Sequence, residues 1–219
     1  MPTIVAIANQ KGGCGKTTTT MHLAGGLSSI GYKVKVVDTD PQATAYMWDS
    51  KESLTFEVQA VPEGALKKEL TKIATENHTD IVLVDCPPGL SGATRIALMA
   101  SNAAIVPIRV GKGDYEATLP FLDLMKQALD ANPQLKVMAF INARANSAID
   151  KQARDFAVKT FAEFANVTVL KTEVPNLALV QKTHFLGTTM FDFKGARNTK
   201  ALHTYNHLIK EILECLSNQ

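Results

Sequence analysis

The chain has 219 residues, a length that suits one α/β domain with a sizeable core better than two domains. With 46% hydrophobic and 20% charged residues it has the composition of an ordinary globular protein, and its net charge of +2 is too small to indicate nucleic-acid binding by itself. The cysteines are Cys14, Cys86 and Cys215, with no C-x-x-C pair among them. We therefore expect reduced thiols rather than a zinc knuckle or a cysteine-bound cluster.

The first predicted strand begins by about residue 3, which leaves no room for a signal peptide and none for a preceding helix-turn-helix domain. No apolar run approaches the length that spans a bilayer. The sequence therefore predicts a cytoplasmic protein that does not cross the membrane.

A glycine-rich loop follows this first strand. Residues 4–8 read Ile-Val-Ala-Ile-Ala, which is typical of a buried strand, and residues 10–18 read Gln-Lys-Gly-Gly-Cys-Gly-Lys-Thr-Thr. Beyond the loop, the spacing of Met21, Ala24, Leu27 and Ile30 predicts one face of a helix. A strand, a glycine loop with Lys-Thr, and a helix form the context of a phosphate-binding loop.

The chemistry of this loop suits an anion. Gly12, Gly13 and Gly15 would let backbone N–H groups converge on a phosphate, and the positive end of the helix would point at the same place. Lys16 is expected to reach the β- and γ-phosphates, Thr17 to bind Mg²⁺, and Thr18 to meet the α-phosphate. The alternative is a plain strand-to-helix turn. The predicted nucleotide-binding residues of the loop are Lys11, Gly12, Gly13, Cys14, Gly15, Lys16, Thr17 and Thr18.

The loop departs from the common G-x-x-x-x-G-K-[ST] pattern, because Gln10 stands where the first glycine belongs and a second lysine, Lys11, lies inside it. In this it resembles the deviant Walker A ATPases, the family that includes ParA, MinD and the nitrogenase iron protein. The resemblance implies that Lys11 contacts the nucleotide held by a second subunit, so that ATP joins a homodimer. A solvated loop lysine is the alternative.

The next buried strand, over residues 34–37, runs into Asp38-Thr39-Asp40-Pro41-Gln42. Ligands of open parallel sheets gather at such strand ends. This V-D-x-D-P-Q pattern resembles the first switch of the ParA family, which implies that Asp40 orients the attacking water and that Asp38 lies nearer Mg²⁺. Alternatively, Asp40 caps a turn that leads to Trp48.

After a weak strand over 54–60 and a helix, the apolar run 81–84 ends in Asp85. A strand that ends in aspartate is the Walker B arrangement, in which the carboxylate holds Mg²⁺ directly or through water. Asp85-Cys86-Pro87-Pro88-Gly89 resembles the family's second switch, D-x-P-P-G, and its glycine supplies the freedom that a γ-phosphate sensor needs.

Further buried strands are predicted over 103–108, 137–141 and 167–170, with helices between them, and Leu122, Met125 and Leu129 are expected on the core face of the first of these helices. The family resemblance implies that Asn142 contacts adenine and that Pro175 and Asn176 line the base pocket. Asparagine also ends strands for turn reasons alone.

Strands that are apolar throughout and alternate with helices predict a doubly wound, mainly parallel sheet with helices on both faces, that is, an α/β P-loop NTPase fold. The resemblance covers nearly the whole chain, from Ile4 to about Glu211, and no linker interrupts it. We expect one ATPase domain over residues 1–219.

Cations near the C-terminus are the candidate DNA contacts. The arginines that the ParA family usually carries just after the proline are replaced by Asn176 and Leu179, and the basic residues stand at Lys182, Lys194, Arg197 and Lys200 instead. In a dimer they would form a stripe that binds phosphates without reading bases, unless they are only a solvated helix face. The last helix lacks a basic cluster, so a MinD-like membrane anchor is not expected.

The resemblance therefore implies a small ParA-type partition ATPase that uses ATP and Mg²⁺, dimerises with ATP and binds DNA non-specifically at the nucleoid. A ParB-like adaptor would stimulate its weak hydrolysis, and the cargo would be a plasmid, a chromosome or a protein body such as a carboxysome or chemoreceptor cluster. The alternatives are a MinD-like positioning ATPase, a metabolic P-loop ligase, a reductase with a metal cluster, and a binding module without ATPase activity.

Overall fold

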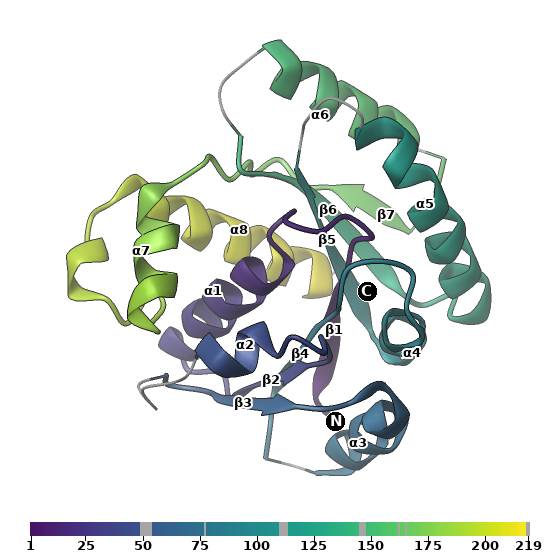
Figure 1. The fold of residues 1–219 in the computed structure, drawn as a ribbon, viewed down its shortest axis with the longest axis horizontal. Helices are drawn as coiled ribbons and strands as arrows, with labels where there is room; N and C mark the ends of the chain where they lie inside the picture. Colours follow the sequence, from purple (N-terminus) through teal and green to yellow (C-terminus); the bar gives the residue numbers. More distant parts are fainter. Residues whose placement is uncertain are drawn as a thin grey trace.

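The computed structural model describes residues 1–48, 54–76, 78–109, 114–144, 148–161, 163–164 and 166–217. Within these ranges seven strands form one sheet in the order β3-β2-β4-β1-β5-β6-β7, and every neighbouring pair is parallel (Figure 1). The strands are β1 (Thr3–Ile7), β2 (Val34–Asp38), β3 (Glu57–Ala60), β4 (Ile81–Asp85), β5 (Ala103–Arg109), β6 (Lys136–Asn142) and β7 (Val167–Val169). This confirms the predicted parallel α/β fold.

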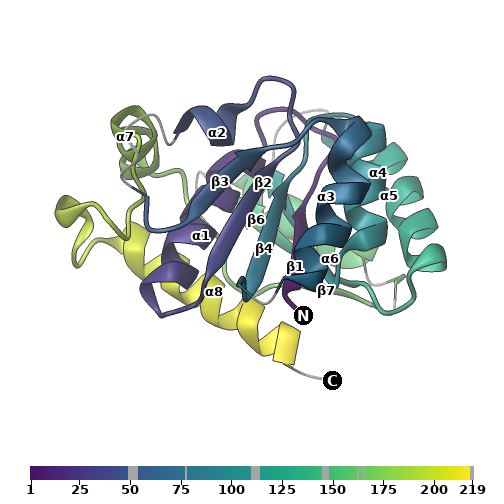
Figure 2. The same ribbon diagram turned by 90° about the horizontal axis from the view of Figure 1, so that it is seen from below.

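Helices cover both faces of the sheet (Figures 1 and 2). One face packs against α1 (Lys16–Ser29), α2 (Thr44–Trp48), α7 (Ala178–Leu186) and α8 (Lys200–Ser217), and the other against α3 (Glu63–Thr75), α4 (Gly92–Ala100), α5 (Asp114–Ala131) and α6 (Ala148–Phe161). A single 3₁₀ turn, η1 (Lys194–Ala196), precedes α8 in the described part of the chain. Each face has its own apolar core, because side chains of a strand point alternately to opposite sides.

The central strands are buried along their whole length, as their apolar sequences predicted. Every residue of β4 is buried, and in β1 only Thr3 is partly accessible. The edge strand β3 is short and half-exposed, which explains its weak sequence pattern.

Helix α5 differs in rotation from the prediction. Among its described side chains, those buried in the core are Phe121, Leu124, Met125 and Ala128. Of the three residues expected there, Met125 is buried, whereas Leu122 and Leu129 lie at the margin of the core and are only partly buried. The three-residue spacing alone could not distinguish between two adjacent apolar rows on one helix.

None of the helices that the described ranges contain is both long enough and apolar enough to pass through a bilayer.

Candidate functional site

The predicted site residues follow strands that end at the same edge of the sheet. β1 lies between β4 and β5, so the chain leaves β1 at the point where the strand order reverses (Figure 1). In open parallel sheets this point opens the crevice in which ligands bind. The loops after β1, β2, β4 and β6 all emerge at this carboxyl edge.

The loop after β1 has the backbone that an anion site needs. Gly13 and Gly15 have φ values of 71° and 94°, which favour glycine. Gly15 is the N-cap of α1 and has no side chain to cap the first N–H groups, and the first turn of α1 holds no acidic residue. A Cβ on Gly15 would also collide with the amide of Asn142. The cradle therefore fits a phosphate group.

Three contacts hold this loop in place. The buried Lys16 donates from Nζ to the carbonyl of Lys11 at 3.1 Å, and the backbone N–H of Lys11 donates to Asn9 Oδ1 at 3.1 Å. From the end of β5, Arg109 Nη1 donates to the carbonyl of Gly13 at 3.2 Å. Lys16 thus lies on the inner side of the loop, whereas Gly12 and Gly13 are exposed.

Asp85 and two hydroxyls of α1 form a compact oxygen cluster at the end of β4. Thr17 Oγ1 donates to Asp85 Oδ2 at 2.7 Å, and Thr20 Oγ1 donates to Asp85 Oδ1 at 3.0 Å. Burial raises the pKa of Asp85 to about 7, and the charge of Asp38 adds to this, while the Thr17 and Thr20 hydrogen bonds act in the opposite direction. The carboxyl is therefore poised to ionise when a cation arrives.

Asp38 lies beside Asp85, because the two residues are paired in the register of β2 and β4. Mg²⁺ is usually held by one or two carboxylates together with phosphate oxygens and water, so Thr17, Asp85 and Asp38 fit such an ion. Among the described residues, no three His, Cys, Asp or Glu side chains form a metal site of their own.

The two aspartates of the first switch have different partners. Asp38 accepts the N–H groups of Asp40 at 3.0 Å and Tyr46 at 2.9 Å, so it caps the start of α2. Burial raises the pKa of Asp38. Asp40 is half-exposed and accepts the N–H of Gln42 at 2.9 Å, which closes a local turn. The turn considered for Asp40 is thus present, whereas the residue that caps α2 is Asp38.

The second switch is tied to the phosphate loop. Gly89 has a φ of 86°, and its N–H donates to the carbonyl of Gln10 at 2.8 Å. A cavity of about 570 Å³ separates the two switch segments and extends to the turn before α3. It is lined by both aspartates of the first switch, by Pro41, Pro62, Pro87 and Pro88, and by Glu63 and Ser91, among others.

On the β6 side, the structure brings Asn142 close to the segment that contains Pro175 and Asn176. Asn142 donates from Nδ2 to the carbonyl of Cys14 at 2.8 Å, so it also supports the phosphate loop. Arg144 pairs with Pro175 in an isolated parallel bridge, and the backbone carbonyl of Arg144 accepts the N–H of Asn176 at 2.9 Å. These residues form one corner of the sheet edge, where the prediction placed the base.

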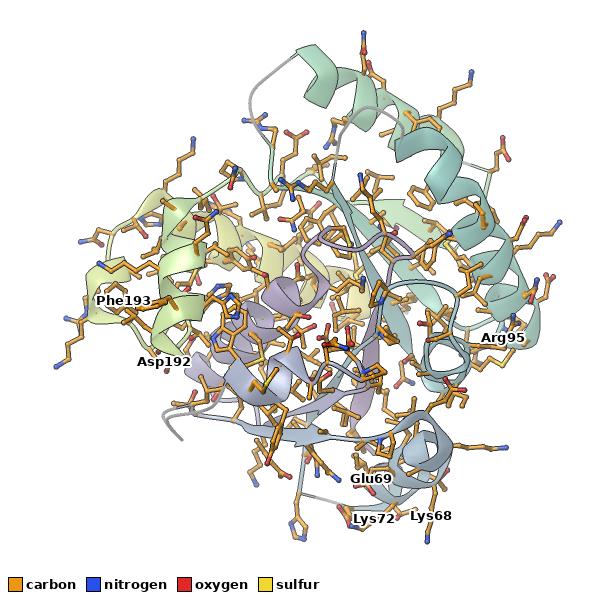
Figure 3. The ribbon with its side chains drawn as sticks, in the orientation of Figure 1. Lys68, Glu69, Lys72, Arg95, Asp192 and Phe193 are labelled. Carbon is orange, nitrogen blue, oxygen red and sulfur yellow. The ribbon has the colours of Figure 1, made fainter. Side chains whose placement is uncertain are left out.

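The four candidate DNA contacts lie elsewhere, over α7, η1 and the start of α8. Lys182, Lys194, Arg197 and Lys200 are all exposed. The ammonium of Lys182 lies 5.1 Å from the centre of the Phe193 ring, on the loop where Figure 3 labels Asp192 and Phe193. The sequence from residue 176 to residue 200 contains these four cationic residues and one acidic residue, Asp192.

Several residues of the site were not singled out from the sequence. Thr20 was detectable, since it follows Thr17 by three positions and so lies on the same helix face. Arg109 contacts the backbone of a distant segment, for which the sequence carries no signal. Gln10 was noted only as a departure from the loop pattern, and its carbonyl accepts an N–H of the second switch.

Comparison with known proteins places these features in a family context. The model of the CobQ/CobB/MinD/ParA nucleotide binding domain matches residues 5–189. The chain is 31% identical over 213 residues to the maintenance of carboxysome distribution protein A of Halothiobacillus neapolitanus, with 95% of each chain covered. It is 26% identical over 239 residues to the chromosome-partitioning ATPase Soj of Thermus thermophilus, covering 95% and 94%.

Among solved structures, the septum site-determining protein MinD of Pyrococcus horikoshii, complexed with Mg-ADP, superposes with a TM-score of 0.72 at 19% identity. The match covers 97% of this chain and 96% of that one, so the two share a fold from end to end.

Proposed function

Because the chain belongs to the CobQ/CobB/MinD/ParA family of nucleotide-binding domains, we propose that it is a ParA-type ATPase that dimerises on ATP, binds DNA without sequence preference and positions a cargo. The observation that carries this proposal is the pair of lysines in one glycine loop. Lys16 lies inside the cradle, whereas Lys11 is half-exposed on the same loop as the exposed Gly12 and Gly13. A second subunit that approaches this side would meet Lys11 next to the nucleotide.

The phosphate cradle and the oxygen cluster beside it are the proposed binding site of ATP and Mg²⁺. The loop residues 11–18 would hold the phosphates, with Thr17, Asp85 and Asp38 around the cation and Asn142, Pro175 and Asn176 around the base. The relative from Pyrococcus horikoshii was solved as its Mg-ADP complex, which agrees with this ligand. When bound, Mg²⁺ neutralises charge on the phosphate oxygens.

Hydrolysis is assigned to Asp40. Its carboxylate is half-exposed and lines the cavity between the two switches, so it is accessible to the water molecule that would attack the γ-phosphate. The same cavity gives both switch segments room to rearrange. Activity is expected to stay weak until an adaptor protein of the ParB kind, or its functional equivalent, docks on the dimer.

The DNA-binding surface is assigned to Lys182, Lys194, Arg197 and Lys200. The local excess of cations over acids is the feature that supports it, since the whole chain is nearly neutral. Contacts of this kind go to phosphates and ignore sequence. The ATP-bound dimer would then be associated with the nucleoid in the cytoplasm, and the ADP form would be released.

For the cargo, a protein body is favoured over a plasmid or chromosome. The relative that is 31% identical over 95% of both chains is named for carboxysome distribution, while the chromosome-partitioning relative from Thermus thermophilus is 26% identical. A metabolic ligase of the same fold is disfavoured by Lys11, the second lysine of the loop, which the family resemblance links to ATPases that dimerise on ATP.

The proposal is tested by DNA binding of the purified protein with ATP, ADP or no nucleotide, at two salt concentrations. We expect tight binding to random-sequence duplexes with ATP alone, and a steep loss of affinity at the higher salt. Equal binding in all three nucleotide states, or none in any, would refute the DNA-binding part of the proposal.

A further inference from the structure

We propose that the stacked rings of Trp48 and His184 link the first switch to helix α7, so that nucleotide binding changes the basic surface within a single subunit. The inference rests on the proposed function for the role of that surface, but the link itself is independent of DNA. Dimerisation brings the basic surfaces of two subunits together, and the proposed link acts in addition to it, inside each subunit.

The link begins at the Asp38 carboxylate. One of its oxygens accepts the N–H of Asp40, which belongs to the switch, and the other accepts the N–H of Tyr46, which belongs to α2. A carboxylate shared in this way transmits a displacement of the switch to α2. The described part of helix α2, Thr44–Trp48, is five residues long, so Tyr46 and Trp48 lie within one turn of each other and are expected to move together.

The connection between switch and helix is also strained. Ala43, directly before α2, has a φ of 50°, a conformation that residues with a Cβ rarely adopt. Its N–H donates to the carbonyl of Asp40 at 2.8 Å, and its own carbonyl accepts from Met47 at 2.8 Å. Residues strained in this way cluster at ligand clamps and switch regions, which agrees with a segment that moves when the nucleotide binds.

Trp48 carries the link across to α7. The side chain is only 3% exposed, and its ring stacks on His184 with centroids 4.3 Å apart and planes 29° from parallel. The indole Nε1 also donates to the carbonyl of Thr188 at 3.0 Å, just beyond the end of α7. Trp48 therefore holds both the last turn of α7 and the segment that follows it.

A second aromatic contact reaches the same place from α1. The buried His22 meets the edge of Trp48 at 5.7 Å between ring centroids, accepts the N–H of Met190 at Nδ1 (3.3 Å) and lies 3.4 Å from Thr183 Oγ1 through Nε2. Since α1 starts at the phosphate loop, both helices that begin at the nucleotide site converge on α7.

The far side of α7 is part of the basic surface. Lys182 lies in the middle of the helix, and its ammonium approaches the ring of Phe193, which directly precedes Lys194. A shift of α7 would therefore change the spacing of Lys182 and Lys194. Because coupling between two binding sites is reciprocal, DNA on this surface should also raise the affinity for ATP.

The test uses full-length protein, Mg²⁺, a non-hydrolysable ATP analogue and random-sequence duplex DNA. His184→Ala removes the stack from its exposed side, and Trp48→Phe keeps a ring but removes the donor to Thr188. His203→Ala, an exposed histidine of α8, is the matched control. Two quantities are measured: amide hydrogen exchange over residues 178–186 with and without the analogue, and the ratio of DNA affinities with and without it.

We expect the analogue to alter exchange in α7 of the wild type and of His203→Ala, and to alter it much less in His184→Ala. The affinity ratio should fall about fivefold or more in both ring variants, with nucleotide affinity in the absence of DNA unchanged. Since Trp48 is buried and lies outside α7, an effect of Trp48→Phe on the ratio cannot be a lost DNA contact.

The link is overturned if the analogue changes α7 exchange in His184→Ala as much as in the wild type, or if it leaves wild-type α7 unchanged. If the wild type binds no DNA in any nucleotide state, the DNA-binding part of the proposed function fails, and the exchange measurement still decides the link.

Discussion

At the scale of single residues, His22 of α1 shows how burial in the core disfavours the protonated form of a histidine. Burial lowers the pKa of His22 to about 3, and the nearby His184 contributes to this. Nδ1 accepts a backbone N–H, so the neutral imidazole is the form that the surroundings accommodate. The unfolded chain takes up a proton near pH 6.5, whereas the native His22 takes one up only near pH 3.

This difference fixes the sign of a pH effect. Between pH 6.5 and 3 the unfolded state binds more protons than the native state through His22, so His22 makes the unfolding free energy fall as the pH falls. The slope is about 1.4 kcal/mol per pH unit. In the protein without ligands, Asp85 acts in the opposite direction below pH 7, because its pKa is raised on folding.

We therefore compare the unfolding free energies of the wild type and His22→Gln. Both proteins contain Asp85, so its contribution cancels in the difference. The advantage in unfolding free energy that the wild type has over the variant should shrink by about 1.4 kcal/mol per pH unit below pH 6.5. Urea denaturation at pH 7.5, 6.5 and 5.5 measures it. His203→Gln, at an exposed histidine, is the matched control. Parallel curves of stability against pH for wild type and His22→Gln would contradict the burial argument.

At the scale of elements, helix α1 is the one on which both the site and the packing depend. Its first turn forms the phosphate cradle, and its C-terminal half carries Gly25 and Gly26. A Cβ on Gly25 would collide with the side chain of Thr189, and one on Gly26 with Ile209 of α8 and with Phe191. The two glycines are therefore required for the close approach of α1 to α8 and to the segment after α7.

Gly26→Ala should lower the unfolding free energy by about 1–3 kcal/mol, because the added methyl group overpacks the α1–α8 contact. The matched control is Gly64→Ala in α3, where a Cβ meets no atom within 4 Å. That change should raise stability by about 0.4–1 kcal/mol, since alanine loses less backbone entropy in a helix. Chemical denaturation of both variants measures these effects; a Gly26→Ala protein as stable as the wild type would show that the helices separate without cost.

At the scale of the whole molecule, the proposed ATP-dependent homodimer brings together the same edge of the sheet from two subunits. In the described chain, the loop with Lys11, the switch with Asp40 and the turn at Gly89 all belong to this edge. The nucleotide would thus be enclosed by two subunits, and its presence would decide whether they associate.

Light scattering, combined with an assay of ATP hydrolysis, distinguishes dimerisation through Lys11 from hydrolysis through Asp40. With Mg²⁺ and a non-hydrolysable ATP analogue, the wild type and Asp40→Ala should double in mass, whereas Lys11→Gln should remain a monomer that still binds nucleotide through Lys16. Asp40→Ala should at the same time lose ATP hydrolysis, because no carboxylate orients the water. A wild-type mass that does not respond to the analogue would contradict the trans contact of Lys11.

Short, contiguous stretches of the sequence were enough to predict much of the fold and of the candidate site. The phosphate loop is a single run of residues between a strand and a helix, so its identity needed no tertiary information. Asp38, Asp85 and Asn142 each end an apolar run, and parallel strands bring such ends to one edge. The parallel sheet with helices on both faces, now confirmed, followed from the same apolar strands.

Only the tertiary structure decided which distant groups meet. It showed that Asp38 rather than Asp40 caps α2, that Gly89 bonds to Gln10, and that Trp48 stacks on His184 across 136 positions of the chain. Such contacts depend on strand order and helix rotation, and these are set by packing between elements rather than by the pattern within any one of them.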